Sequence, residues 1–393
     1  MENRKHNQEF LSLKSIPENQ LLFFMIIGLV FLSIRLYMPL LDAEFFLDDY
    51  LHLIIVKENI NPLNVFAKDF MLGAFYRPIV YFVWKINYVF FNINPRMYYF
   101  INIVILIGNS LLLLFIMHLS KMNKLISFFA VCIWIVNPIT ATGTVWLSSR
   151  YDLVSTFFLL SSILFYVLFH LGGRWKLYIL SLIFALLSYF SKESCLSLPL
   201  LIIAFYLKIE KKAGLKDKFL GIIVFTIPYI LLALLFMFIR LEVLGNWGGY
   251  DFTGNIALSN YRLITGYFMK PLSNKIVLFS YLLLIILLVK NKINSTARLS
   301  FIWIFASLLP VIPLYKLLFI PGMLLFLPYR FFFLTGLGMT FLVCSLLEQL
   351  SRKNRIAGAI ALSLVLSMFV IKMYKSRQII NDWKKETIKV HET

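Results

Sequence analysis

The chain has 393 residues, of which 60% are hydrophobic and only 15% are charged, and its mean hydropathy is +0.83. This composition excludes an ordinary water-soluble globular protein and indicates a polytopic membrane protein. The formal net charge of +19 does not indicate nucleic-acid binding, because the Lys and Arg residues lie in short clusters between apolar runs, as membrane topology signals do.

Apolar runs of membrane-spanning character recur along the whole chain. A helix needs roughly 20 residues to cross about 30 Å of hydrocarbon, where lipid offers no partner for backbone polar groups. We expect about eleven such helices. They lie near residues 20–41, 97–118, 125–138, 153–171, 176–190, 195–208, 219–240, 275–290, 299–316, 324–347 and 357–373. The sequence therefore predicts an all-α polytopic membrane protein.

The charged clusters predict how the chain is divided. We expect a cytoplasmic segment at residues 1–19, a transmembrane domain at 20–373 and a short basic tail at 374–393. With the N-terminus inside, most basic clusters fall in inner loops, and the outer side holds two long loops, 42–96 and 241–274. We expect the first outer loop to form helices that lie along the membrane interface. An odd number of helices places the tail outside, whereas its basic residues are typical of an inner segment. The orientation of the tail therefore stays open.

Charged residues near the outer helix ends are the candidates for chemistry, because charges at a membrane are costly. In FFLDDYLHL, Asp48 and Asp49 are adjacent, so in a helix their side chains point about 100° apart and only one can be the catalytic base. Arg77, before a proline that starts a helix, can grip a phosphate. Lys192 in SKES is suited to an anion near a helix N-terminus.

Each motif also has a simpler reading. The acidic pair can cap a helix, Arg77 can reach lipid headgroups, and Arg150 with Asp152 can form an internal ion pair. These alternatives stay open for single residues. However, all the candidates fall on the outer side, and we expect them to converge on one outward-facing cavity. The full set adds supporting residues to the acids and cations: Asp48, Asp49, Arg77, Lys192, Arg330, Tyr50, His52, Arg150, Asp152, Glu193 and Tyr329.

The order and spacing of five segments resemble those of a known enzyme family. The segments are LDDY, FYRPIVYFVWKINYVFFNINPRMYYFINIVIL, WLSSRYDLVSTFFLLSSILFY, YFSKESCLSLPLLI and PYRFFFLTGLGM. From about residue 20 to 385 the chain is similar to the GT-C membrane glycosyltransferases, in particular the protein O-mannosyltransferase-like and tetratricopeptide-linked O-mannosyltransferase branches, without the repeats. The resemblance implies a GT-C-like fold in a bacterial inner membrane with an outward-facing active site.

The same resemblance implies an activity. A sugar, such as the hexose mannose, would move from a polyprenyl-phosphate donor to a protein, lipid or glycan acceptor on the outer or lumenal face. Asp48 or Asp49 would be the general base, and Arg77, Lys192 and Arg330 would bind the donor phosphate, because negative charge grows there as the bond breaks. Attack opposite the phosphate inverts the anomeric centre.

Two other functions remain as alternatives, an O-antigen polymerase or ligase and a membrane transporter. A transporter should carry its charges near the midplane, whereas here they gather toward one face. The sequence identifies no cofactor with certainty, and the use of a divalent cation such as Mg²⁺ or Mn²⁺ stays open, since the acidic candidates offer hard oxygen ligands.

Overall fold

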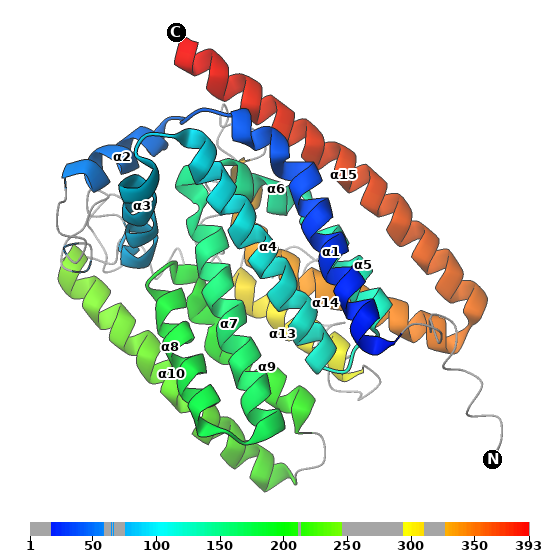
Figure 1. Cartoon of the computed structure of the whole chain (residues 1–393). Coiled ribbons are helices and arrows are strands. Elements are labelled where there is room, and N and C mark those ends of the chain that lie inside the picture. The colour runs from blue at the N-terminus through cyan, green and yellow to red at the C-terminus, as the bar shows by residue number, and fades with distance from the viewer. Residues whose placement is uncertain are drawn as a thin grey trace, which may run out of the picture.

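The computed structural model describes residues 17–58, 64, 66, 75–210, 214–245, 294–309 and 327–392, and all its regular elements there are helices (Figure 1). Their bounds are α1 Glu18–Tyr37, η3 Met38–Asp42, α2 Asp48–Glu58, α3 Pro78–Phe91, α4 Pro95–Leu119, α5 Lys124–Ile135, α6 Pro138–Val145, η5 Leu147–Ser149, α7 Tyr151–Gly172, α8 Trp175–Tyr189, η6 Glu193–Ser197, α9 Leu198–Ile209, α10 Leu215–Leu244, α13 Ser295–Leu308, η8 Leu327–Phe332, α14 Phe333–Lys353 and α15 Arg355–Glu392, where η denotes a 3₁₀ helix. The all-helical fold agrees with the sequence prediction.

Within the described ranges, six helical segments are long and apolar enough to cross a membrane. They are Asn19–Asp42, Pro95–Leu119, Leu147–Gly172, Lys216–Leu244, Arg330–Lys353 and Ile356–His391. The helices α5 and α6 meet at a bend of 52° and make a seventh span if they count as one. A polytopic membrane protein is therefore the class that the structure supports.

The expected number of about eleven spans is not established. Three of the expected spans form helices of only 12 to 15 residues, namely α5, α8 and α9. A helix of that length is too short to cross about 30 Å of hydrocarbon alone. The expected span at 275–290 and the end of the one at 299–316 lie outside the described residues. The count of eleven remains a prediction.

Buried polar side chains tie the central helices together. The helix α7 packs against both α4 and α8. Asn109 on α4 donates to the Leu153 carbonyl of α7 at 3.0 Å. Ser162 on α7 and Ser181 on α8 donate to each other's carbonyls at 2.8 and 2.6 Å. Small polar residues allow such close approach in lipid, where apolar burial alone gives helices little reason to associate.

The described part of the expected first outer loop forms two helices, α2 and α3. These helices pack on each other, and both lie at one end of the molecule (Figure 1). The helix α3 starts at Pro78, as the sequence suggested, because proline fits the first helical position, where a missing N–H costs nothing. Of the second outer loop, only the end of α10 and Gly245 are described, and residues 246–274 lie outside the described residues.

Residues 374–392, expected as a tail, continue α15 to its end. Trp383 is buried and its indole N–H donates to the Tyr99 hydroxyl at 3.1 Å. Lys384 pairs with Asp42 at 2.8 Å, just before the acidic pair. The helix is about 57 Å long at 1.5 Å per residue, so it extends beyond the hydrocarbon. The C-terminal end of the chain therefore lies at the same end of the molecule as α2 (Figure 1).

Candidate functional site

The two adjacent carboxylates at the start of α2 have different surroundings. Asp49 is fully buried and accepts hydrogen bonds from the backbone N–H groups of Phe46 at 3.0 Å and Ser148 at 2.7 Å, and from the Ser148 hydroxyl. Burial raises the pKa of Asp49 to about 7, although these hydrogen bonds act to lower it. The hydrogen bonds of Asp49 with Ser148 therefore link α2 to η5.

Asp48, in contrast, is exposed at the surface of α2. Partial burial raises the pKa of Asp48 above its ordinary value, and the positive charge of Arg330 acts in the opposite direction. Arg330 belongs to η8 and Asp48 to α2, so this electrostatic effect links two elements that are far apart in the sequence. Of the two acids, Asp48 is the one that a substrate can reach.

The three cations expected to bind phosphate come together around one aromatic ring, that of Tyr151 at the start of α7. The guanidinium carbon of Arg77 lies 4.3 Å from the ring centroid. The Lys192 ammonium lies 5.0 Å and the Arg330 guanidinium carbon 5.9 Å from the same centroid. These distances are typical of cation–π contacts. The fold thus places Arg77, Lys192 and Arg330, which precede α3, η6 and α14, around one tyrosine ring.

Carboxylates lie among these cations. Arg77 donates to one oxygen of Glu193 through Nε at 3.1 Å and Nη2 at 2.9 Å, and Arg240 of α10 lies 3.6 Å from its other oxygen. Lys192 forms an ion pair with Asp152. Burial alone would raise the pKa of Glu193, but the two arginines outweigh it and hold that pKa below its ordinary value.

We call this group the outer charge cluster. It consists of Asp48, Arg77, Asp152, Lys192, Glu193, Arg240 and Arg330, so four cations stand against three carboxylates. Arg330 also lies over the Trp146 ring at 4.4 Å. A surplus of positive charge beside partly buried aromatic rings favours an anion.

Local chain geometry places the cluster at helix starts. Arg77 directly precedes α3, and Lys192 directly precedes η6 with an extended backbone. Tyr151 is the first residue of α7 and Asp48 the first of α2. The N-terminal ends of α3 and α7 carry partial positive charge, which adds to that of the cationic side chains.

Arg150 is buried in the protein interior and does not pair with Asp152, so the internal ion pair considered from the sequence is wrong. Its guanidinium is fully buried and donates to Asn102 at 2.9 and 3.1 Å and to the Tyr98 carbonyl at 3.0 Å. Asp152 pairs with Lys192 instead. The reason is helical direction, since neighbouring residues at a helix start point to different sides.

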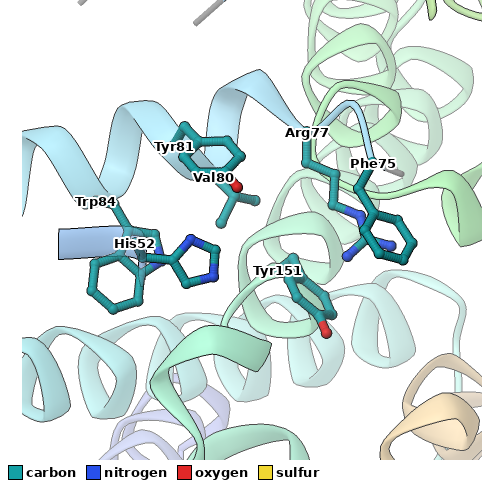
Figure 2. Close-up of a pocket in the computed structure, with 7 residues that line it drawn as sticks. All are labelled: His52, Phe75, Arg77, Val80, Tyr81, Trp84 and Tyr151. Carbon is teal, nitrogen blue, oxygen red and sulfur yellow. The ribbon is translucent and has the colours of Figure 1, made fainter. Parts of the chain in front are cut away.

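A pocket lies beside the cluster, between α2, α3 and the start of α7 (Figure 2). The cavity is small, with a volume of about 10 Å³, which leaves room for about one water-sized group, and it is lined by His52, Phe75, Arg77, Val80, Tyr81, Trp84 and Tyr151. The His52 ring stacks on Trp84 with centroids 4.9 Å apart. Arg77 and Tyr151 line the pocket and also take part in the contacts of the cluster, so the two features share these side chains.

The other supporting candidates are less informative. Tyr50 is 40% exposed, and its ring meets Phe45 edge-on at 6.2 Å. The side chain of Tyr329 lies outside the described part of the structure. Among the described residues, no group of three or more His, Cys, Asp or Glu side chains could hold a metal ion, and metal use stays an open question.

Sequence reasoning missed Tyr151, Trp84 and Arg240. Arg240 carried the signal used for the other candidates, a charge near the outer end of an apolar helix. Tyr151 and Trp84 carried no such signal, because aromatic residues are common throughout this chain, at 17% of all residues.

No protein-family model matches the chain, and no curated protein matches it either. A function for this protein therefore depends on the geometry of the site.

Proposed function

We propose that the protein is a GT-C-type membrane glycosyltransferase. It moves a sugar, a hexose such as mannose, from a polyprenyl-phosphate donor to an acceptor hydroxyl at the outer membrane face. The observation that carries this proposal is the gathering of Arg77, Lys192 and Arg330 around Tyr151, with the exposed Asp48 under the influence of Arg330.

The outer charge cluster suits the donor phosphate. A sugar phosphodiester carries one negative charge, and the cluster has one more cation than it has carboxylates. As the glycosidic bond breaks, a second negative charge develops on the departing phosphate. Cations already fixed in a poorly hydrated site stabilise that charge without reorganising. The lipid chain of the donor would remain in the bilayer beside the apolar helices.

Asp48 suits the role of general base. An acceptor hydroxyl must lose its proton as its oxygen attacks the anomeric carbon, and an exposed carboxylate with a raised pKa accepts protons well. A single carboxylate is sufficient because phosphate leaves without being protonated. Attack from the opposite face then inverts the anomeric centre. Asp49 supports this step by holding α2 against η5.

The test compares sugar transfer from a radiolabelled polyprenyl-phosphate hexose into membrane acceptors for four proteins at equal expression. These are the native protein, Asp48→Asn, Asp49→Asn and the control Asp42→Asn, which removes an exposed carboxylate that pairs with Lys384 away from the cluster. We expect Asp48→Asn to lose transfer by about 100-fold or more while it still binds donor. The control should retain full transfer.

Two outcomes would refute the proposal. One is full transfer by Asp48→Asn, which would remove the base from the mechanism. The other is no covalent product from the native protein with any polyprenyl-phosphate hexose. In the second case, movement of the labelled lipid without bond cleavage would favour a transporter, and a product with many added sugars would favour a polymerase.

A further inference from the structure

His52 is a buried polar side chain with an unusual environment. It is only 4% exposed, and neither ring nitrogen has a hydrogen-bond partner among the residues that the structure describes. Its ring is held between Trp84, on which it stacks, and Tyr81, with centroids 5.4 Å apart. Buried polar atoms in native proteins nearly always have a partner, so an exception needs an explanation.

The ring of His52 lines the pocket, and Arg77 of the outer charge cluster lines it as well (Figure 2). Burial and the positive charges of Arg150 and Arg77 lower the pKa of His52 to about 3. The imidazole is therefore neutral at ordinary pH, with one nitrogen that donates and one that accepts. A hydroxyl group, which also donates and accepts, is the matching partner.

The same charges select against a cationic ligand. Arg77 forms part of the pocket wall, and Arg150 lies close enough to depress the pKa of His52. An ammonium group entering this pocket would meet positive charge in a poorly hydrated space, where repulsion is strong. An uncharged hydroxyl meets no such penalty. The Trp84 and Tyr81 rings beside His52 make the rest of this lining apolar.

We propose that this small pocket accepts one uncharged hydroxyl group of the donor sugar, with the sugar ring at the pocket mouth, and that His52 selects that group. The inference rests on the proposed function and deepens it, because it assigns the sugar class. Arg77 connects the two parts of the ligand. It lines the pocket and stands in the phosphate-binding cluster, and the sugar of the donor is bonded directly to the phosphate. Neutral hexoses are the predicted substrates, and amino sugars with a free ammonium are excluded.

The experiment measures ligand-induced thermal stabilisation of the purified full-length protein in nanodiscs. The probes are a short-chain prenyl phosphate, the same lipid carrying mannose and the same lipid carrying glucosamine. The difference between the first two isolates the contribution of the sugar. The variants are His52→Phe, which keeps the stacked ring but removes both nitrogens, and His52→Gln, which keeps a polar group. His170→Phe is the matched control, because the side chain of His170 is also largely buried among aromatic rings but lies in the last turn of α7.

We expect His52→Phe to bind the mannose lipid about tenfold more weakly than the native protein does, because two hydrogen bonds are lost. Binding of the prenyl phosphate alone should stay within about twofold. His52→Gln should recover part of the loss, and His170→Phe should behave like the native protein. Without ligand, His52→Phe should melt at a higher temperature, since it removes two buried polar atoms that lack partners.

The possible failures are distinct. If prenyl phosphate and its mannose derivative both bind to the native protein but His52→Phe leaves their difference unchanged, the pocket assignment is wrong and the proposed function stands. Tighter binding of the glucosamine lipid than of the mannose lipid would also overturn the assignment. If neither the phosphate lipid nor either sugar lipid binds, the proposed function and the inference are both refuted.

Discussion

Replacing Asp49 by asparagine should change the pH dependence of stability in a defined direction. Asp49 is fully buried, and burial raises its pKa to about 7. In the unfolded chain its pKa returns to about 4, so between these values the folded state holds a proton that the unfolded state has released. Its contribution to stability is therefore fully present below about pH 4 and is lost as the pH rises to about 7.

The magnitude follows from the size of the shift. Each pKa unit corresponds to about 1.4 kcal/mol, so Asp49 costs the native protein about 4 kcal/mol above pH 7 relative to acid pH. The amide of the Asp49→Asn variant does not titrate. The stability of this variant minus that of the native protein should therefore rise with pH, by about 2 kcal/mol between about pH 5 and 7, and become constant about one pH unit above 7.

His52 supplies an internal control of opposite sign. Its pKa is lowered to about 3, so its contribution is present above about pH 6.5 and is lost as the pH falls toward 3. The stability of His52→Phe minus that of the native protein should rise as the pH falls, by about 2 kcal/mol between about pH 6.5 and 5. In the native protein the two effects oppose each other over this interval.

The assay is reversible unfolding by sodium dodecyl sulfate in mixed micelles, followed by tryptophan fluorescence at several pH values. Differences between variant and native curves cancel the contribution of every other titrating group. The double variant should lose both slopes. Parallel curves for Asp49→Asn and the native protein would show that Asp49 is ionised in the folded state and would contradict the prediction.

Two further substitutions test the packing around the cluster. Arg77→Ala should lower stability by about 3 kcal/mol, because it leaves the partly buried Glu193 without its closest cation, and Glu193→Gln in the same chain should recover much of that loss in an unfolding cycle. Gly143→Ala should cost about 1–3 kcal/mol, because its Cβ would lie 2.5 Å from the Phe333 ring, whereas Gly172→Ala, with nothing within 4 Å, should not destabilise the fold in thermal melting.

The sequence predicted the helices better than the number of spans. Long apolar runs such as those of α4 and α10 can be recognised in the sequence as membrane-spanning helices, because their hydropathy and length both exceed those of helices in soluble proteins. The runs of α5 and α9 are also apolar but form only 12 residues of helix each. After α5, Pro138 opens α6 at an angle of 52°, and α9 begins only at Leu198, because the 3₁₀ helix η6 occupies the residues before it. Hydropathy alone does not register such breaks.

The sequence pointed to the charged residues of the cluster but not to the ion pairs that they form. Arg77, Lys192 and Arg330 could be selected as candidates because charged residues are few in this chain and each costs free energy at a membrane. The choice of partner depends on which helices become neighbours. Asp152 faces Lys192 rather than Arg150 because α7 packs against α8 and η6. The different surroundings of Asp48 and Asp49 follow in the same way from the packing of α2 on η5.

Arg77 belongs to both the pocket and the outer charge cluster, so it would contact both the sugar and the phosphate of the proposed donor. The Arg77 guanidinium lies between the rings of Phe75 and Tyr151, at 4.2 and 4.3 Å, and two of its nitrogens donate to Glu193. These contacts fix its plane before any ligand arrives, so a phosphate loses little free energy in orienting it. A sugar bonded to that phosphate would then extend along the same wall toward His52. Recognition of the phosphate and selection of the sugar would thus be geometrically coupled through one side chain.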